Sequence, residues 1–487
     1  MRPCSRTTAA LRPLGWFAAV LACLTTAAAR AEPARRAGPP NIVFILIDDL
    51  GWTDLGCFGS GYYETPHIDR LAAEGMRLTS HHHCPNCVPT RAALMTGQYG
   101  PRTGVYTVGS IERFEWSRRP LRPVDNVENL PLDREIVAAA LGRAGYATAI
   151  FGKWHLGERG GHHPGRRGFD EAITTMNNHF GFTTRPPVPH AADEYLADFL
   201  TDRAVDFITR HAAEPFFLYL AHFGVHEPFE AKSDLKKRFA DKPAVGGHGD
   251  PTYAAMIASV DESVGRVVGT LAELGLTDDT LVIVTSDNGG LGGYEREGIV
   301  VAERLGRSGG ITDNAPLRSG KGSLYEGGIR VPFVAKWPGV TTPGGTTDEP
   351  TVHVDLYPTF LEVAGAAKPA HPLDGESLVK LFRDPAARLE RDAIFQHFPG
   401  YLGARAGTWR TTPVSVVQAG RWKLMEFLED GRLELYDLES DLGETRNRAA
   451  DMPDMTRRLH ERLVAWRREV GAQMPTLNAD SAQPVDP

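Results

Sequence analysis

The sequence predicts an α/β fold in which a mostly parallel sheet is covered by helices on both faces. Short apolar runs typical of strands alternate with longer helical patterns between residues 41 and 364. Polar side chains follow four of these runs directly, at the points where the strands would end. Since ligands bind beyond the carboxyl ends of strands in open α/β sheets, the two observations together predict one binding region at one edge of the sheet.

The first expected strand, residues 41–47, is an unbroken apolar run, which fits a strand buried on both faces of a parallel sheet. Four later runs have the same character, and helical patterns separate them. The expected strands are 41–47, 146–151, 216–220, 281–285 and 331–335, and the expected helices are 132–143, 195–211, 253–274 and 355–364. Parallel neighbours in such a sheet are joined by right-handed crossovers.

Beyond residue 368 the pattern changes to short alternating segments separated by turn residues. Residues 414–418, 423–427 and 433–436 alternate like antiparallel strands, and residues 455–470 read as a closing amphipathic helix. This part of the chain is therefore expected to form a small C-terminal α+β subdomain that contains an antiparallel sheet.

The N-terminal segment is typical of an export signal. Arginines precede an apolar run at residues 14–24, and a small-x-small cleavage site ends at Ala31. A membrane anchor is the alternative, but the run is too short to span a bilayer. Lipid attachment at Cys23 is a weaker alternative. We expect an exported protein, periplasmic or secreted, because no other stretch is long and apolar enough to cross a membrane.

These patterns predict five consecutive regions. They are a signal peptide (1–31), a tether (32–40), a main α/β domain (41–367), the C-terminal subdomain (368–473) and a loose tail (474–487). After cleavage only Cys57, Cys84 and Cys87 remain, too few for a disulfide scaffold. Cys57 and Cys84 could pair or stay as free thiols. The formal net charge of -8 gives no nucleic-acid footprint, so an anionic substrate must be met by a local positive site.

Residues 84–97 carry the most informative local pattern. Pro89 fits the first position of a helix and Gly97 fits its end, which places Cys87 just ahead of a short helix. The Cys87 side chain would then face free backbone N–H groups, and Arg91 could reach it from one turn away. Together these features predict an anion site. The alternative is a structural cysteine before an ordinary capped helix.

Chemistry-bearing side chains follow four expected strands. They are Asp48 and Asp49, then Lys153 and His155, then His222 and His226, and finally Asp287 and Asn288. Adjacent carboxylates repel one another unless a cation lies between them, and an all-oxygen set suits Ca²⁺ or Mg²⁺. Taken singly, each pair has a simpler explanation: a helix cap, an Asp-Asn-Gly turn, a surface lysine or a core histidine.

The longer strings add a family resemblance. Cys87-x-Pro89-x-Arg91 followed by Ala-Ala-Leu-Met-Thr-Gly resembles the signature of the type I sulfatases, which belong to the alkaline-phosphatase-like superfamily. Residues 152–157, 216–228, 320–332 and 434–444 resemble further segments of that family, so the resemblance covers nearly the whole mature chain. It implies the alkaline-phosphatase-like version of the predicted fold, and oxidation of Cys87 to Cα-formylglycine by a formylglycine-generating (sulfatase-maturating) enzyme.

The resemblance also implies roles for individual residues. The implied metal ligands are Asp48, Asp49, Cys87 as formylglycine, Asp287 and Asn288, with Ca²⁺ the usual metal and Mg²⁺ the alternative. The implied catalytic residues are Cys87, Arg91, Lys153, His155, His226 and Lys321. Arg91 would stabilise the aldehyde hydrate, while Lys153 and Lys321 would hold the sulfate. His226 would protonate the leaving alcohol, and His155 would act as base.

In the implied reaction, one hydroxyl of the hydrated aldehyde attacks sulfur, and deprotonation of the other expels sulfate. The expected substrate is a sulfated glycan or an aryl sulfate. One alternative is a phosphonate monoester or phosphodiester hydrolase of the same superfamily. Another is an inactive glycan-binding protein, which would follow if Cys87 stayed a thiol. Loops 111–128, 159–190 and 290–312 are expected to select the substrate.

Two histidine features lie outside the implied motif. Three consecutive histidines, His81 to His83, look like a metal-binding tract, but no family ligand falls there, and we expect a loop near the pocket rim. His222 is expected to support the site or the core, because His226 and not His222 precedes the Glu-Pro pair of the motif.

Overall fold

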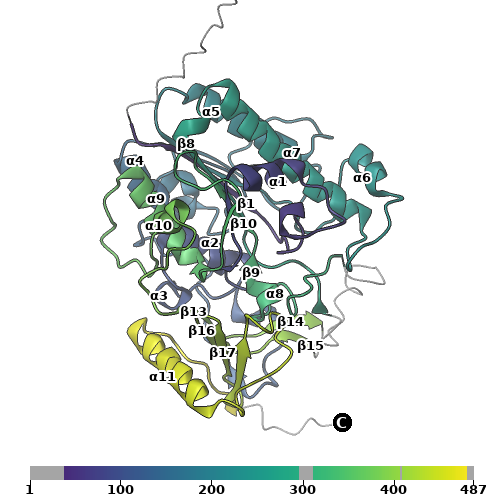
Figure 1. Ribbon diagram of the computed structural model, residues 1–487. Helices are drawn as coiled ribbons and strands as arrows, with labels where there is room; N and C mark the ends of the chain where they lie inside the picture. The colour runs from purple at the N-terminus through teal and green to yellow at the C-terminus, as the bar shows by residue number, and fades with distance from the viewer. Residues whose placement is uncertain (1–37, 295–310, 406–407, 480–487) are drawn as a thin grey trace, which may run out of the picture. The chain divides into compact units, whose positions relative to one another are not determined.

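Strand β1 (Asn41–Ile47) lies at the centre of an eight-stranded sheet in the computed structural model, which describes residues 38–294, 311–405 and 408–479 (Figure 1). The strand order is β11-β2-β10-β8-β1-β7-β5-β6. The other strands of this sheet are β2 (Met76–Leu78), β5 (Ala147–Gly152), β6 (Glu171–Thr174), β7 (Phe216–Ala221), β8 (Thr280–Ser286), β10 (Phe333–Lys336) and β11 (Gly345–Thr347). The predicted mostly parallel sheet is confirmed, since β1 pairs in parallel with β7 and β8, and β5 with β6 and β7.

The expected single strand at residues 331–335 is wrong in one respect. Pro332 separates β9 (Arg330–Val331) from β10, because proline has no N–H to donate to a ladder. Strand β10 then runs antiparallel to β8, while β9 pairs with β3 (His81–His82), which also pairs with β12 (Thr351–Val352).

Helices cover both faces of the sheet, as alternate side chains of β1 require. Val43, Ile45 and Ile47 belong to a core shared with helices α1 (Pro66–Glu74), α5 (Leu196–Arg210), α6 (Ser233–Phe239) and α7 (Pro251–Glu273). The intervening side chains, Ile42, Phe44 and Leu46, pack with α2 (Cys87–Thr96), α4 (Val137–Arg143), α9 (Leu356–Ala364) and α10 (Val379–Arg383). Helix α4 is shorter than the expected 132–143, and Leu132 at its predicted start is 57% exposed, so the apolar stripe is not buried there.

The C-terminal part contains a four-stranded antiparallel sheet, as expected. Its order is β13 (Ile394–Phe398), β16 (Val414–Ala419), β17 (Trp422–Phe427) and β18 (Arg432–Asp437). Helix α11 (Pro453–Glu469), yellow in Figure 1, packs on this sheet through Leu459, Leu463 and Trp466. The smaller elements are α3 (Gly100–Thr103), α8 (Glu326–Ile329), β4 (Leu121–Arg122), β14 (Leu402–Arg405), β15 (Thr408–Thr411) and β19 (Thr476–Leu477).

The ends of the chain are described only in part. The expected signal peptide, the cleavage site after Ala31 and Cys23 lie outside the described residues, as do residues 480–487 of the expected tail. Within that tail, β19 pairs with β4. Among the described residues, no helix combines the length and the apolar character that crossing a bilayer requires. The limits of the five predicted regions stay predictions.

Candidate active site

The four expected strand ends meet at one edge of the central sheet. Asp48 and Asp49 follow β1, and Asp287 follows its parallel neighbour β8. Lys153 follows β5 and His226 lies five residues beyond β7, on the other side of β1. Parallel strands end on the same side, so the polar residues that follow them are brought together.

Helix α2 delivers Cys87 to this edge. The helix begins at Cys87 itself, with Asn86 as its N-cap, and not at Pro89 as the local pattern predicted. Pro89 is tolerated as the third helical residue because the first N–H groups of a helix have no intrahelical partner. All ten residues of α2 are buried, and Gly97 ends the helix in the left-handed conformation with φ 66°.

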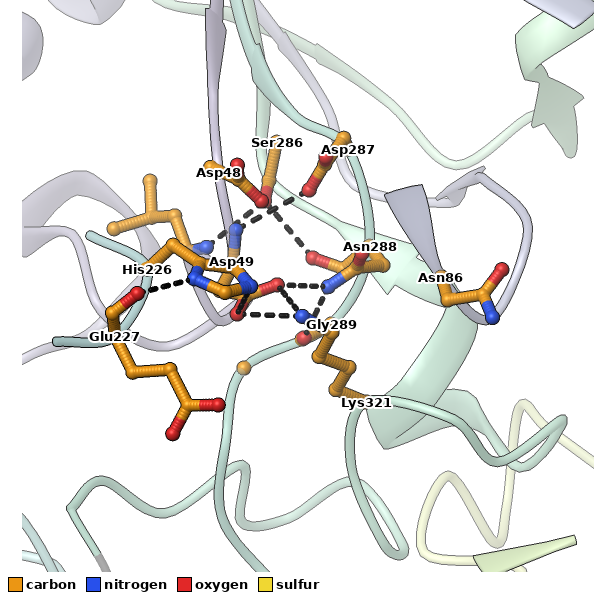
Figure 2. A network of polar contacts seen from close by, with 12 residues as sticks. Asp48, Asp49, Asn86, His226, Glu227, Ser286, Asp287, Asn288, Gly289 and Lys321 are labelled. Carbon is orange, nitrogen blue, oxygen red and sulfur yellow. Dashed lines mark hydrogen bonds and ion pairs between the residues drawn. The ribbon is translucent and has the colours of Figure 1, made fainter. Parts of the chain in front are cut away.

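The Cys87 thiol lies among carboxylates. Its Sγ and one carboxylate oxygen each of Asp48 and Asp287 lie within 4.8 Å of one another. A second group of the same compactness joins Asp48 and Asp49 with a ring nitrogen of His226. Figure 2 shows Asp48 and Asp287 on either side of Ser286, with Asp49, Asn288 and Lys321 converging below them and Asn86 set apart.

Three cations balance these three carboxylates; Arg91 and Lys153 are buried, and Lys321 is partly buried. Arg91 Nη2 lies 2.7 Å from Asp287 and 3.5 Å from Asp48, and Arg91 Nη1 donates to the Lys153 carbonyl oxygen at 2.7 Å. Lys153 Nζ contacts Asp48 directly. Lys321 Nζ lies 2.7 Å from Asp49 (Figure 2).

Two oxygen atoms of the cluster lack partners. Asn288 donates through its amide nitrogen to Asp49 at 2.8 Å, which turns its amide oxygen away from that carboxylate. That oxygen and Oδ1 of Asp48 are buried, and no donor among the described residues reaches either of them. Buried polar atoms normally have a partner, and carboxylate and amide oxygens are the ligands that Ca²⁺ and Mg²⁺ prefer. The residues present therefore fit a hard divalent cation.

The three carboxyl groups differ in the direction in which their surroundings shift the pKa. Burial, with repulsion from Asp287, raises the pKa of Asp48 to about 7. Burial also opposes ionisation of Asp49, but Lys321 and His226 hold the pKa of this carboxyl below its usual range. Likewise Arg91 and Lys153 outweigh burial and lower the pKa of Asp287. Of the three, Asp48 has the least compensated charge, and it also carries an unpartnered oxygen.

The thiol and the pocket histidines are held neutral. Burial raises the pKa of the Cys87 thiol, although Lys153 and Lys321 oppose the rise. Burial and the charge of Lys153 lower the pKa of His155 well below its ordinary value. Burial and the charge of Lys321 lower the pKa of His226 to about 3. A neutral thiol is a poor nucleophile, whereas a neutral imidazole can accept a proton.

Hydrogen bonds fix the orientation of His226. Its Nδ1 donates to the carbonyl oxygen of Glu227 at 2.6 Å, since a carbonyl can only accept, and its Nε2 faces Asp49 at 3.6 Å (Figure 2). The ring of His179 donates through Nε2 to the backbone oxygen of His226 at 2.8 Å. Sequence reasoning missed His179, because nothing in its local sequence indicates a contact 47 residues away.

These residues open onto a pocket of about 650 Å³. Cys87, Lys153, His155, His226 and Lys321 line it, as the sequence predicts. The expected specificity loops contribute Arg113, Phe114, Met176 and Asn177, and the third loop lies largely outside the described residues. Sequence reasoning missed Leu402, Gly403 and Arg410, which come from β14 and β15 of the C-terminal part. Only their contacts across the chain identify them.

Two further expectations concern histidines and thiols. The prediction of a rim loop at residues 81–83 is wrong, because His81 and His82 form the buried strand β3, and none of the three lines the pocket. His222 is buried with its Nε2 3.0 Å from Ser263 Oγ, which fits the expected supporting position. Cys57 and Cys84 are both free thiols.

Comparison with known proteins gives consistent matches. The Sulfatase family profile matches residues 40–366, and a profile for the C-terminal part of N-sulphoglucosamine sulphohydrolase matches residues 320–469. A sulfatase of Formosa agariphila is 33% identical over 88% of each chain. Human N-acetylgalactosamine-6-sulfatase is 35% identical over 76% of this chain and 72% of its own. The crystal structure of Ps i-CgsB with k-i-k-neocarrahexaose superposes with a TM-score of 0.72 at 28% identity, covering 92% of this chain and 94% of the other.

Proposed function

The chain belongs to the type I sulfatase family of the alkaline-phosphatase-like superfamily, and from that membership we propose that it removes sulfate from glycans with a formylglycine made from Cys87 and a divalent cation. The chain is accordingly a sulfuric ester hydrolase. The proposal of a formylglycine beside a divalent cation depends on the position of Cys87 Sγ, which lies within 4.8 Å of carboxylate oxygens of Asp48 and Asp287.

The proposed ligands of the cation, Ca²⁺ by preference and Mg²⁺ as the alternative, are Asp48, Asp49, Asp287, Asn288 and residue 87. The unpartnered oxygens of Asp48 and Asn288 support this set, since a cation would supply what no donor supplies. When bound, the cation supplies a positive charge that acidifies a neighbouring hydroxyl and offsets charge on the sulfate. Arg91 holds Asp287 in place for this purpose.

Conversion of Cys87 is supported by the chemistry of its surroundings. The raised pKa keeps the thiol protonated near neutral pH, so an unmodified cysteine would attack sulfur poorly. When formed, the formylglycine hydrate supplies one hydroxyl to attack sulfur and a second whose deprotonation releases sulfate. A formylglycine-generating enzyme is therefore a proposed partner of this chain.

The remaining pocket residues act on charge and protons. Lys153 and Lys321 present two ammonium groups to the transferring sulfate, and their carboxylate contacts hold both in position. His155 is neutral and suits a base. His226 presents Nε2 to the pocket because its Nδ1 is bound to Glu227. It suits the acid that protonates the leaving alcohol once a bound sulfate ester favours its charged form.

Two of the similar proteins support a glycan substrate. One is an N-acetylgalactosamine-6-sulfatase, and Ps i-CgsB was crystallised with a neocarrahexaose. The pocket volume of about 650 Å³ exceeds what a sulfate alone would fill and lies in the range of pockets that bury larger ligands. Export to the periplasm or beyond, as the N-terminal sequence predicts, would give the enzyme access to such polymers.

The test uses the chain co-expressed with a formylglycine-generating enzyme. Hydrolysis of an aryl sulfate is measured beside that of an aryl phosphonate monoester and a phosphodiester, and the peptide containing residue 87 is examined by mass spectrometry. We expect the mass of the aldehyde and the highest kcat/KM on the sulfate. Higher kcat/KM on the phosphonate or phosphodiester would favour the sibling hydrolase. An unmodified thiol together with no hydrolysis would favour a glycan-binding protein.

A further inference from the structure

The wall of the pocket carries more positive charge than sulfate transfer requires. Among the described residues, its lining contains four cations, Arg113, Lys153, Lys321 and Arg410, and one carboxylate, Glu227. Lys153 and Lys321 contact Asp48 and Asp49 of the site already described. Arg113 and Arg410 are not among the residues that contact Asp48 or Asp49, and they have no part in the proposed reaction.

Arg410 stands beside the sulfate-binding end of the pocket. Its stem packs over Gly322, where an added Cβ would meet Arg410 Cδ at 3.0 Å, so the side chain lies against the residue that follows Lys321. Its guanidinium lies over the ring of Tyr294 with Cζ 5.2 Å from the centroid, and the hydroxyl of Tyr294 donates to the backbone oxygen of Lys321. The Arg410 head is therefore held next to the segment that carries Lys321.

Arg410 has no anionic partner among the residues that the structure describes. Within the described part of the chain, no ion pair joins its guanidinium to a carboxylate, and its Nε is buried with no acceptor. Buried N–H groups of a charged side chain normally have an acceptor, and guanidinium groups match carboxylates and sulfates through paired N–H donors. An acceptor supplied by a ligand would complete this arrangement.

Arg113 reaches the same wall from another part of the chain. It ends a short 3₁₀ turn, Ile111–Arg113, and Phe114 beside it packs on Gly403, where an added Cβ would meet the ring at 2.9 Å. Gly403 of β14 is paired with Trp409 of β15, the neighbour of Arg410. The two arginines thus come from segments that touch, and we name them the arginine wall.

We propose that the arginine wall binds a second anionic group of the substrate, so that the enzyme acts on glycans that carry a carboxylate or another sulfate besides the ester that is cleaved. The inference rests on the proposed function, because it needs the scissile sulfate to lie between Lys153 and Lys321. Arg410 is its main determinant and Arg113 adds charge. A neutral monosulfated sugar or a simple aryl sulfate would use only the reacting end of the pocket.

The test compares substrates that differ in one group. The matured enzyme is assayed on three oligosaccharides with the same scissile sulfate: one otherwise neutral, one with a neighbouring hexuronic acid and one with a second sulfate. An aryl sulfate serves as the reference for the reacting end. We expect kcat/KM to be at least about tenfold higher for one of the two anionic oligosaccharides than for the neutral one. Which of the two is preferred distinguishes a carboxylate from a sulfate.

Three variants assign the preference to the wall. Arg410→Gln should remove most of the preference, chiefly through KM, while kcat/KM on the aryl sulfate stays within about threefold of wild type. Arg410→Lys, which keeps the charge, should recover part of it. Arg468→Gln, at an exposed position near the end of α11, makes the same charge change away from the pocket and should leave the preference unaltered.

The outcomes separate the two proposals. If the wild type hydrolyses no sulfate ester, the proposed function fails first. If it hydrolyses all three oligosaccharides equally well, or Arg410→Gln lowers every substrate by the same factor, the sulfatase assignment stands and the arginine wall does not bind substrate.

Discussion

Two buried clusters of charged side chains in this molecule contain the same kinds of residue. They differ in whether the protein supplies a partner for each side-chain oxygen. The first is the active-site cluster of Asp48, Asp49 and Asp287 with Arg91, Lys153 and Lys321. The second, which we call the seam cluster, consists of Glu326, Lys423 and Glu444 with His82 and Arg330, and it joins β3, β9 and α8 to the C-terminal sheet. The members of both are buried or nearly so, and each cluster mixes carboxylates with cations.

In the seam cluster every carboxylate oxygen either forms an ion pair with a cation or accepts a hydrogen bond. Lys423 Nζ lies 2.9 Å from Glu326 and 2.7 Å from Glu444, and Glu444 also accepts the backbone N–H of Glu326 at 2.7 Å. The other carboxylate oxygen of Glu326, Oε2, lies 2.6 Å from Nε of Arg330 and 3.0 Å from Nε2 of His82. In the active-site cluster, Oδ1 of Asp48 forms neither contact with any described residue, and the same is true of the amide oxygen of Asn288 beside the cluster. The protein alone completes the seam cluster, whereas the active-site cluster leaves oxygens that the proposed cation would complete.

The largest expected effect is the loss of activity when the Cys87 side chain is removed from the active site. Cys87→Ala should lower kcat/KM on an aryl sulfate by more than about 10⁴-fold, because it removes the group that is proposed to become the nucleophile. Thermal unfolding should change little, since alanine is compatible with the start of a helix. Cys57→Ala, at a thiol outside the pocket lining, is the matched control and should retain activity. Retention of activity within about tenfold by Cys87→Ala would contradict the assignment.

A second change separates function from stability within the same cluster. Asp48→Asn should reduce kcat/KM by about 10²–10³-fold, as loss of one charged group aimed at a reacting centre typically does. Its metal-free form should be at least as stable as wild type at pH 8. The folded pKa of Asp48 is raised to about 7, so above that pH folding buries a charge that the amide does not carry. A variant that is both active and destabilised would reverse the comparison.

Lys423→Met should lower stability and leave activity nearly unchanged, which is the reverse of the result expected for Asp48→Asn. It leaves the buried carboxylates of Glu326 and Glu444 without their shared cation, which is expected to cost about 3–5 kcal/mol of unfolding free energy. The kcat/KM of the folded fraction should stay within about threefold of wild type, since no member of the seam cluster lines the pocket. Glu444→Gln is the milder control, because burial raises the pKa of Glu444 to about 7 and neutralising it removes little. Denaturant unfolding measures both variants.

The smallest expected effect concerns histidines that are enclosed rather than open to the pocket. Burial lowers the pKa of His222 to about 3 and of His397 to about 4. Folding therefore keeps both rings neutral, and the stability they contribute is complete above pH 6.5 and is lost as pH falls toward the folded pKa. At pH 5 each should cost about 2 kcal/mol. His222→Gln should flatten the fall in unfolding free energy between pH 7 and pH 5, and an unchanged slope would contradict this account.

The same contrast marks how far the sequence predicts the structure. Asp48, Lys153 and Asp287 were predicted at the site because each follows an apolar run, and parallel strands end on one side of a sheet. The seam cluster could not be predicted, since Glu326 and Lys423 are 97 residues apart and neither stands in a local pattern. Arg410 was not predicted to line the pocket for the same reason. Local sequence predicts where a strand ends but not which distant side chain lies against it.

Two local errors have physical causes. Helix α2 begins two residues earlier than Pro89 suggested, because a proline is acceptable throughout the first turn of a helix. His81 to His83 are buried because a polar ring can enter a core when its nitrogens find partners, such as the 2.9 Å contact between Nε2 of His81 and Nε2 of His83. Composition alone indicates a surface tract in such a case.

The most direct test of the central claim, that the active-site cluster is completed by a cation, is a calcium titration of the matured, chelator-treated protein by calorimetry. We expect wild type and Glu444→Gln to bind about one Ca²⁺ per chain, and Asp48→Asn to bind it at least about 100-fold more weakly. Binding by Asp48→Asn with the wild-type affinity, or full sulfatase activity in protein that holds no divalent cation, would contradict the claim.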